Sequence, residues 1–313
     1  MQQRPVGVSG LQVSSLGLGT MTWGRTTDEH EAREQLTRFL DAGGTLVDTA
    51  HVYNEGASET MLGALIADLG ARDDVVLATK AGITSRTGER RLDTSRRTLL
   101  DDLDTSLRRL RTERIDLWQV HVWTDQTPLE ETLAALEQAV TSGKVHYVGI
   151  SNYNGWQTAR AATLLEGSAA PIVSTQVQYS LLARDSEDEV LPAAAALGVG
   201  VLPWSPLASG VLTGKYRTGT PSDSRAADST YGQHVHTYLD DRSQGIVGAV
   251  ARAAEGLGWT PAEVALAWVR DRPGVTAPIL GARTSAQLKA LLGVADKNLP
   301  PEITAALDDV SDI

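Results

Sequence analysis

Polar side chains that can hold and transfer a proton follow three consecutive predicted strands of this chain. Asp48 and Tyr53 lie in the run LVDTAHVYNEGASE. Lys80 ends the run VVLATK, and His121 ends the run IDLWQVH. When parallel strands alternate with helices, their carboxyl ends meet at one face, where barrel enzymes hold their catalytic groups. The sequence therefore predicts a polar cluster at the carboxyl end of a parallel barrel.

Each of these residues, taken alone, also has a structural interpretation. Asp48 can cap a turn, Lys80 can pair with any carboxylate, Tyr53 can be a packed aromatic, and His121 can be a core histidine. Together they favour chemistry, because a lysine that ends a buried strand is costly to desolvate unless it is paired, and Asp48 is available on the neighbouring strand. A cation beside Tyr53 favours the ionised phenol and lowers its pKa, so Tyr53 is expected to donate a proton near neutral pH.

The elements that must position these residues repeat along the chain. Short aliphatic runs alternate with amphipathic stretches at intervals of roughly thirty residues, which is typical of βα units. Eight runs are predicted strands: Val13–Leu18, Leu46–Asp48, Val75–Thr79, Ile115–Val120, Val145–Ile150, Val173–Val177, Gly200–Pro203 and Val275–Leu280. Eight strands are the number that closes a (β/α)8 TIM barrel, which is the predicted fold class.

Helical periodicity and end signals predict the intervening helices. They are a helix from Thr27 or Asp28 to Ala42, one from Ser58, one striped by Leu99, Leu103, Leu107 and Leu110, and others over Leu129–Ala139, Glu187–Leu197, Gln244–Leu257 and Pro261–Arg270. No linker divides the chain, so residues 1–313 are expected to form a single domain. Residues Ser209 to Arg242, rich in Gly, Ser, Thr, Asp and Pro, predict a long lid loop after the seventh strand.

Composition narrows the class of protein. Lys and Arg total 28 against 39 Asp and Glu, and the net charge of −11 makes nucleic acid an unsuitable partner. The absence of cysteine excludes disulfides, thiolate metal sites and a catalytic thiol. No apolar stretch has the length of a membrane span and the first residues lack a signal core, so we expect a cytoplasmic protein that does not enter membranes.

The glycine-rich run GLGLGTMTWG, from Gly17, does not have the spacing G-x-G-x-x-G of a Rossmann dinucleotide site, and no strand that ends in an acidic residue follows at the required distance. The phosphate-binding P-loop pattern is also missing from the chain. We therefore interpret the run as a tight turn that leaves the first barrel strand.

Several runs together indicate a family. They are GLGTMTWG, DTAHVYNEGASE, LATK, IDLWQVH, VGISNY, TQVQYSLL, PWSPLASGVLTGKY and PILGARTSAQL, which extend nearly from end to end. In these runs the chain resembles the aldo-keto reductases, in particular the branch related to potassium-channel β subunits. The resemblance implies a (β/α)8 barrel that binds NADP(H) across the carboxyl end of its sheet without a Rossmann domain. It also implies a catalytic tetrad of Asp48, Tyr53, Lys80 and His121.

The resemblance further implies which residues bind the cofactor. Ser151, Asn152 and Gln176 match residues that bind the carboxamide, whereas Tyr179 either stacks on the nicotinamide or belongs to the core. Gly281, Arg283 and Gln287 open the last helix, whose amino-terminal dipole suits an anion. The full implied set is Thr20, Met21, Asp48, Ser151, Asn152, Gln176, Tyr179, Trp204, Ser205, Pro206, Leu207, Gly210, Lys215, Arg225, Gly281, Arg283 and Gln287.

Two positions depart from the family pattern. Related sequences tend to carry a Glu and an Asn where this chain has Ala290 and Leu291. In those relatives the Glu and the Asn bind the adenine. Hydrocarbon side chains cannot replace those hydrogen bonds, so weaker adenine binding is expected.

The predicted substrate is a small carbonyl compound. Trp23, His51, Tyr53, His121 and Trp123 are expected to line its pocket, which favours an apolar or aromatic aldehyde or ketone and leaves sugar aldehydes open. The predicted function is NADPH-dependent reduction of aldehydes or ketones to alcohols by hydride transfer, with Tyr53 as general acid and His121 orienting the carbonyl.

Two other functions stay open. One is an NADP(H)-binding redox sensor that acts through a protein partner with little turnover, although no such partner is indicated by the sequence. The other is a hydrolase or isomerase with a metal ion at Asp48 and His121, for which two ligands are too few. No metal is therefore expected.

Overall fold

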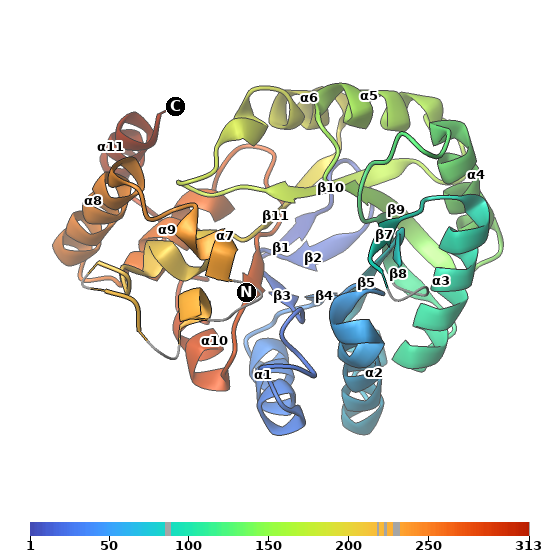
Figure 1. Cartoon of the computed structure of the whole chain (residues 1–313), viewed down its shortest axis with the longest axis horizontal. Helices are drawn as coiled ribbons and strands as arrows, with labels where there is room; N and C mark the ends of the chain where they lie inside the picture. The colour runs from blue at the N-terminus through green and yellow to red at the C-terminus, as the bar shows by residue number, and fades with distance from the viewer. Residues whose placement is uncertain (85–88, 218, 222–223, 228–231, 313) are drawn as a thin grey trace.

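The computed structural model describes residues 1–84, 89–217, 219–221, 224–227 and 232–312. Its centre is an eight-stranded sheet in the order β11, β10, β9, β8, β5, β4, β3 and β12, in which every pairing is parallel. A parallel bridge between Val201 and Val275 brings the two edges of the sheet together, so the barrel is nearly closed. Helices surround the sheet (Figure 1), and the predicted (β/α)8 barrel is confirmed.

The barrel strands lie close to the predicted runs. They are β3 (Gly17–Gly19), β4 (Leu46–Asp48), β5 (Val76–Ala81), β8 (Ile115–Val120), β9 (Val145–Ser151), β10 (Ile172–Gln178), β11 (Gly200–Trp204) and β12 (Ile279–Gly281). The first predicted strand, Val13–Leu18, is wrong as one element, because its first half is β2 (Gln12–Ser14), which pairs antiparallel with β1 (Gln3–Pro5). Only the second half enters the barrel, as β3.

The helices begin at residues whose side chains satisfy their first backbone N–H groups. Asp28 caps the first helix by accepting from the Glu31 N–H at 2.9 Å, and Thr260 and Glu263 form a capping box. The helices are α1 (Glu29–Asp41), α2 (Ala57–Leu69), α3 (Arg96–Leu110), α4 (Leu129–Thr141), α5 (Gly155–Leu164), α6 (Val190–Leu197), α7 (Gly232–His236), α8 (Asp241–Leu257), α9 (Pro261–Arg270), α10 (Ser285–Leu292) and α11 (Pro301–Ser311).

Short elements complete the described chain. A second antiparallel pair, β6 and β7, lies beyond the carboxyl end of β5. The short elements are β6 (Ile83–Thr84), β7 (Arg91–Leu92), and the 3-10 helices η1 (Tyr53–Gly56), η2 (Arg72–Asp74), η3 (Asp185–Glu187), η4 (Ala208–Thr213) and η5 (Arg225–Ala227).

Side chains along each barrel strand alternate between the interior and the helices. Leu46, Ala78 and Leu117, from three adjacent strands, share one buried apolar cluster. Two residues later on the same strands come Asp48, Lys80 and Gln119, which are also buried. The interior of the barrel therefore has an apolar layer followed, toward the carboxyl end, by a polar layer.

The β1–β2 hairpin closes the amino end of the barrel. Val6 and Val13 have no exposed surface and belong to the same cluster as the apolar layer. Burying a valine side chain contributes roughly 1.5–3 kcal/mol. The hairpin therefore adds to stability and keeps water from the floor of the barrel.

The long lid loop predicted for the segment between β11 and α8 is not confirmed. Its described part includes η4, η5 and α7, and Val211, Leu212, Tyr216 and Val235 are buried with residues of α8 and α9 in a second core cluster. These side chains bury enough apolar surface to hold the segment against the helices. Residues 218, 222–223 and 228–231 of the expected lid lie outside the described residues.

Helix α2 packs closely on the end of α3 at Gly63. A Cβ atom on Gly63 would lie 2.5 Å from the Arg109 carbonyl oxygen and 2.5 Å from Leu110 backbone atoms. Gly245, on the exposed face of α8, has nothing within 4 Å of the same position. The two glycines therefore differ in whether a methyl group can be accommodated.

This difference predicts opposite effects of the same substitution. Gly63→Ala should lower the free energy of unfolding by about 1–3 kcal/mol, because steric overlap outweighs the better helix propensity of alanine. Gly245→Ala should raise it by about 0.5–1 kcal/mol. Urea unfolding of both variants measures the effects. Equal stabilisation by both would show that α2 and α3 separate easily.

Candidate active site

An ion pair lies at the carboxyl end of β4 and β5. Lys80 Nζ lies 2.5 Å from Asp48 Oδ2 and donates a second hydrogen bond to the Thr49 carbonyl oxygen at 2.8 Å. The two charged side chains are 0% and 3% exposed. A lone charge in such a position would cost several kcal/mol. Each side chain therefore compensates the buried charge of the other. The pair expected from the two strand ends is present.

The charge of Lys80 is retained despite its burial. Burial disfavours the ammonium ion, but the negative charge of Asp48 and the interaction with the Tyr53 phenol more than offset it, so the pKa of Lys80 is raised above its ordinary 10.5. A permanent positive charge therefore lies at the bottom of the candidate site at physiological pH.

Two glutamines complete the polar layer. Gln176 Nε2 donates to Asp48 Oδ1 at 2.9 Å, and Gln119 Nε2 lies 3.4 Å from the same oxygen. In this arrangement the Gln176 amide nitrogen is used by Asp48 and not by a ligand. Gln119 was not expected from the sequence, although its place two residues before His121 on β8 shows that it must face the interior.

Tyr53 lies beside this charge on η1, directly after β4. Lys80 Nζ lies 5.2 Å from the centre of its ring, and the His121 ring lies edge-on at 5.9 Å. The two residues that follow, Asn54 and Glu55, have φ values of 49° and 57°. Left-handed backbone is costly for residues other than glycine. Asn54 offsets this cost by donating 2.8 Å hydrogen bonds to the Met21 and Trp23 carbonyl oxygens.

His121 lies on the other side of the phenol as a neutral ring. Burial is the main reason that its pKa is lowered well below the ordinary 6.5, and the positive charges of Lys80 and Arg90 lower it further. Within the described residues, its Nδ1 atom is buried and makes no hydrogen bond. A neutral imidazole has one donor and one acceptor nitrogen, so His121 can donate a hydrogen bond to a carbonyl oxygen without carrying charge.

Backbone strain is concentrated around the mouth of the barrel. Asn152, Ser205, Ala208 and Ser209 have φ values of 57°, 56°, 46° and 56°, and all follow the carboxyl ends of β9 or β11. Strain of this kind persists where surrounding contacts over-determine it, which is common at functional sites. Asn152 supplies such contacts, because its amide donates to the His121 carbonyl oxygen at 2.9 Å and accepts from Trp204 Nε1 at 3.0 Å.

The residues after β11 fit a diphosphate. Successive turns that mix left-handed and right-handed residues form concave surfaces that bind anions. At Gly210, with φ of 90°, a Cβ atom would lie 3.2 Å from Lys215 Nζ, so the missing side chain leaves room for the exposed ammonium group. Of the other implied residues, Ser205 and Leu207 are partly exposed and Pro206 is buried. The Arg225 side chain lies outside the described residues.

Two carboxylates of α1 lie at the amino terminus of α10, beside the expected anion site. Glu31 of α1 accepts a hydrogen bond from the Ser285 N–H at 2.5 Å, and Glu34 accepts from the Ser285 hydroxyl at 2.6 Å. This hydroxyl is the main reason that the pKa of Glu34 is lowered. The chain's own carboxylates therefore occupy this end of the helix. It is also not the last helix, because α11 follows.

Near α10, the remaining implied residues make mainly local contacts. Gln287 Oε1 accepts from the Arg283 N–H at 3.0 Å, and Gly281 ends β12 with an exposed surface. Leu291 is only 8% exposed and packs in the main core, whereas Ala290 is exposed. The position of Leu291 therefore contributes to packing, and an asparagine there would be buried in the core.

Three residues that were expected to contact ligands are buried. Tyr179 has no exposed surface, and its hydroxyl donates to Glu187 at 2.6 Å, which fits the core alternative. Trp23 is fully buried with its indole N–H on Gln35. Because neither ring reaches solvent, neither can contact a ligand in this arrangement. His51 is 8% exposed and lies behind the Tyr53 turn.

The remaining implied residues lie around the mouth. Thr20 is buried and donates its backbone N–H to the Asp48 carbonyl oxygen at 3.0 Å. Met21 is partly exposed next to it. Ser151 is buried and donates to the Gln176 carbonyl oxygen at 2.8 Å. Trp123 is partly exposed and lies edge-on to Trp156, which is 53% exposed.

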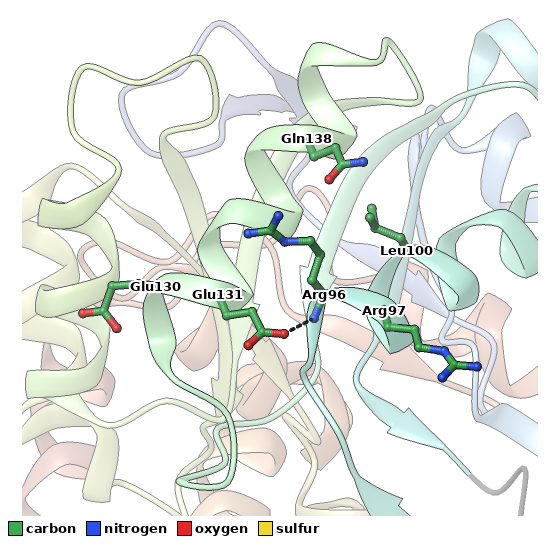
Figure 2. Close-up of a pocket in the computed structure, with 6 residues that line it drawn as sticks. All are labelled: Arg96, Arg97, Leu100, Glu130, Glu131 and Gln138. Atoms are coloured by element: carbon green, nitrogen blue, oxygen red, sulfur yellow. Dashed lines mark hydrogen bonds between the residues drawn. The ribbon is translucent and has the colours of Figure 1, made fainter.

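A groove of about 710 Å³ lies elsewhere, on the outer surface between α3 and α4. Figure 2 shows the residues that line it, Arg96, Arg97 and Leu100 from α3 and Glu130, Glu131 and Gln138 from α4, with a hydrogen bond from the Arg96 N–H to Glu131 between the two helices. The residues around it are mixed in charge, and none belongs to the polar layer.

The described residues also contain no group of three or more His, Asp or Glu placed to hold a metal ion. They contain no helix long and apolar enough to cross a membrane.

The fold and this site define a class of protein: a parallel barrel with a buried ion pair, a phenol and a neutral imidazole at its carboxyl end. Comparison with known proteins agrees. The family model described as "Aldo/keto reductase family" matches residues 15–312, and the chain belongs to this family. It is therefore an oxidoreductase of a family that acts on small carbonyl substrates.

Similar proteins span nearly the whole chain. "Uncharacterized oxidoreductase YrpG" of Bacillus subtilis is 38% identical over 325 residues, which cover 99% of this chain and 96% of the relative. "Protein tas" of Escherichia coli is 34% identical, with 100% and 98% covered. A "Probable voltage-gated potassium channel subunit beta" of Arabidopsis thaliana is 36% identical, with 95% and 92% covered. The expected resemblance to both reductases and channel subunits is confirmed.

The lowered pKa of His121 predicts how stability changes with pH. In the unfolded chain its imidazole takes up a proton near pH 6.5, whereas in the folded chain it does so only at lower pH. The unfolded state therefore binds more protons between these values, and stability falls as pH decreases below 6.5, by up to about 1.4 kcal/mol per pH unit. His121→Gln should remove this part of the loss.

Free energies of unfolding at pH 8 and pH 5 measure the effect. His30→Gln is the matched control, because the His30 side chain is 79% exposed, and this variant should keep the loss of stability that comes from His121. Parallel curves for the parent and His121→Gln would contradict a neutral His121 in the folded protein.

Proposed function

We propose that this protein is an NADPH-dependent reductase of aldehydes or ketones, with Tyr53 as the proton donor. The observation that carries the proposal is the buried Asp48–Lys80 pair, which keeps a positive charge 5.2 Å from the centre of the Tyr53 ring. A fixed cation favours the ionised form of a neighbouring phenol and brings its pKa toward neutrality. A phenol alone is too weak an acid for this role.

The chain's residues divide the chemistry between them. NADPH, when bound, supplies the hydride that reduces the carbonyl carbon. Tyr53 donates its phenolic proton to the carbonyl oxygen as negative charge develops there. Lys80 stabilises the phenolate that remains and adds positive potential at the same place. His121, which is neutral, orients the carbonyl oxygen through a hydrogen bond without competing as a proton donor.

We propose that the cofactor lies across the strained loops of the mouth. Asn152 and Ser151 lie at the end of β9, where a carboxamide can reach them, and the partly exposed Trp204 indole offers a plane for the nicotinamide ring. The Gly210 turn and Lys215 would hold the diphosphate. Arg283, which is partly exposed, would hold the 2′-phosphate.

A sensor role is the second candidate, and the 36% identity to a probable potassium channel β subunit favours it. One experiment separates the two functions: NADPH oxidation is followed optically against a panel of aldehydes, ketones, quinones and sugars. Steady turnover with any compound supports the reductase. Tight NADPH binding without turnover over the whole panel would favour the sensor.

The role of Tyr53 predicts a selective loss of turnover. Tyr53→Phe removes only the hydroxyl, so NADPH binding and the folded structure should persist while kcat for carbonyl reduction falls by about 10²-fold or more. Tyr147→Phe is the matched control, because Tyr147 lies near the amino end of β9 and its hydroxyl takes no part in the site. A Tyr53→Phe variant that keeps most of its turnover would assign the proton donor elsewhere.

The α10 terminus predicts how cofactor choice is set. Arg283→Ala should weaken NADPH binding by about tenfold or more, the size of a lost charge-assisted hydrogen bond, and leave NADH binding nearly unchanged. Glu31→Gln should strengthen NADPH binding by several-fold, because it removes a like charge near the phosphate site. Quenching of tryptophan fluorescence gives both dissociation constants. Equal losses for the two cofactors in Arg283→Ala would place the 2′-phosphate away from this helix.

A further inference from the structure

We propose that Arg109 of α3 is a positioning residue for Tyr53, acting from behind the turn that carries the phenol. This inference rests on the proposed role of Tyr53 as proton donor. It concerns a residue that does not touch the candidate pocket: the Arg109 side chain reaches inward from an outer helix and is 25% exposed.

The guanidinium group of Arg109 holds both ends of the Tyr53 turn. Its NH1 donates to the His51 carbonyl oxygen at 2.9 Å, two residues before Tyr53. Its NH2 lies 3.4 Å from the Glu55 carbonyl oxygen, two residues after Tyr53. A planar group with several fixed donors can hold two carbonyl oxygens at a set separation, which a flexible ammonium cannot do.

A buried carboxylate fixes the guanidinium in turn. Glu59 of α2 has no exposed surface, and its Oε2 lies 3.1 Å from Arg109 NH1. Its other oxygen accepts from the Thr79 hydroxyl at 2.7 Å. Thr79 directly precedes Lys80 on β5, so Glu59 ties Arg109 to the strand that carries the tuning cation. Tyr53 and Lys80 are therefore both held in place through the Glu59–Arg109 pair.

The turn is shaped to admit this group. Gly56 ends η1 with a φ of 92°, and a Cβ atom there would lie 2.1 Å from Arg109 Cζ. Any larger residue would push the guanidinium away. Together with the left-handed Asn54 and Glu55, this makes the turn a strained segment that needs external contacts. The Asn54 side chain and the Arg109 guanidinium group supply these contacts.

His51 adds a lateral contact to the same support. Its Nε2 lies 3.4 Å from Asp102 Oδ1, on the buried face of α3, and its Nδ1 lies 3.4 Å from Arg109 NH1. His51, which is expected from the sequence to line the substrate pocket, therefore also helps to hold the turn. Lys80 and His121 lie next to the Tyr53 ring, with Asp48 beyond Lys80.

The test compares Arg109→Ala and Arg109→Lys with Arg108→Ala. Arg108 is exposed on the same helix, and its NH2 donates to the Thr105 hydroxyl one turn earlier on that helix. It is therefore the matched control. Arg109→Ala should lower kcat by on the order of 10²-fold, the size of the effect of displacing a catalytic group by about 1 Å. The dissociation constant for NADPH should stay within about threefold of the parent value, because the residues proposed to bind the cofactor lie on other elements than α3.

Chemical rescue distinguishes positioning from a general loss of structure. Millimolar guanidinium should restore part of the kcat of Arg109→Ala, because it can fill the space beside Gly56 and pair with Glu59, whereas methylammonium should not. Arg109→Lys keeps the ion pair and the fold but loses the planar fork, and its kcat should still fall by about tenfold or more. Parent-like kcat in Arg109→Lys, or equal rescue by both cations, would overturn the proposal.

A readout without turnover separates this inference from the proposed function. The pKa of Tyr53 is measured from ultraviolet absorbance against pH, as the difference between a protein with Tyr53 and the same protein with Tyr53→Phe. Arg109→Ala should raise the pKa of Tyr53, because the phenol moves away from Lys80. If the parent reduces no carbonyl compound but this shift occurs, the reductase assignment fails and the positioning role stands. If the parent turns over and the titration of Tyr53 is unchanged in Arg109→Ala, the positioning role fails alone.

Discussion

The buried pair of Asp48 and Lys80 is the interaction on which the rest of the site depends. An uncompensated charge inside the barrel would cost several kcal/mol, so the pair has to be accommodated by every element around it. β4 and β5 bring the two residues together, Gln176 and Gln119 satisfy the second carboxylate oxygen, and the Thr49 carbonyl oxygen accepts from the ammonium group. The phenol and the imidazole are placed around a charge that is already stabilised.

A second pair, Glu59 and Arg109, repeats this design one layer outward. The inner pair provides positive potential, and the outer pair fixes the backbone turn above it. The two pairs are joined through β5, because Lys80 and Thr79 are consecutive. Backbone strain and buried charge are thus collected at the carboxyl end, whereas the amino end is closed by aliphatic side chains. The division matches the general separation of function and stability between the two ends of such barrels.

Much of this arrangement could be predicted from the sequence, because strand ends and desolvation follow local rules. Asp48, Lys80 and His121 end short aliphatic runs, and the cost of a buried lysine points to its partner. Side chains on loops were harder to predict. Nothing in the sequence around Trp23 or His51 shows whether the ring faces the pocket or the core. The contact of Glu31 with Ser285 joins residues 254 positions apart, and the hairpin that takes Val13 out of the barrel depends on closure of the whole sheet.

The apolar layer beneath the ion pair has a consequence for salt. At moderate ionic strength, mobile ions screen the interactions of exposed charges that are more than roughly 10 Å apart and screen buried charges much less. Val6, Val13 and Leu46 fill the floor of the barrel, so ions do not reach the pair from that side. Because Lys80 is almost fully buried, its interaction with the Tyr53 phenol is screened less than an interaction between two exposed charges would be. Lys215, in contrast, is exposed. In the proposed reductase, ionic strength should therefore act more on the capture of the anionic cofactor than on proton transfer from Tyr53.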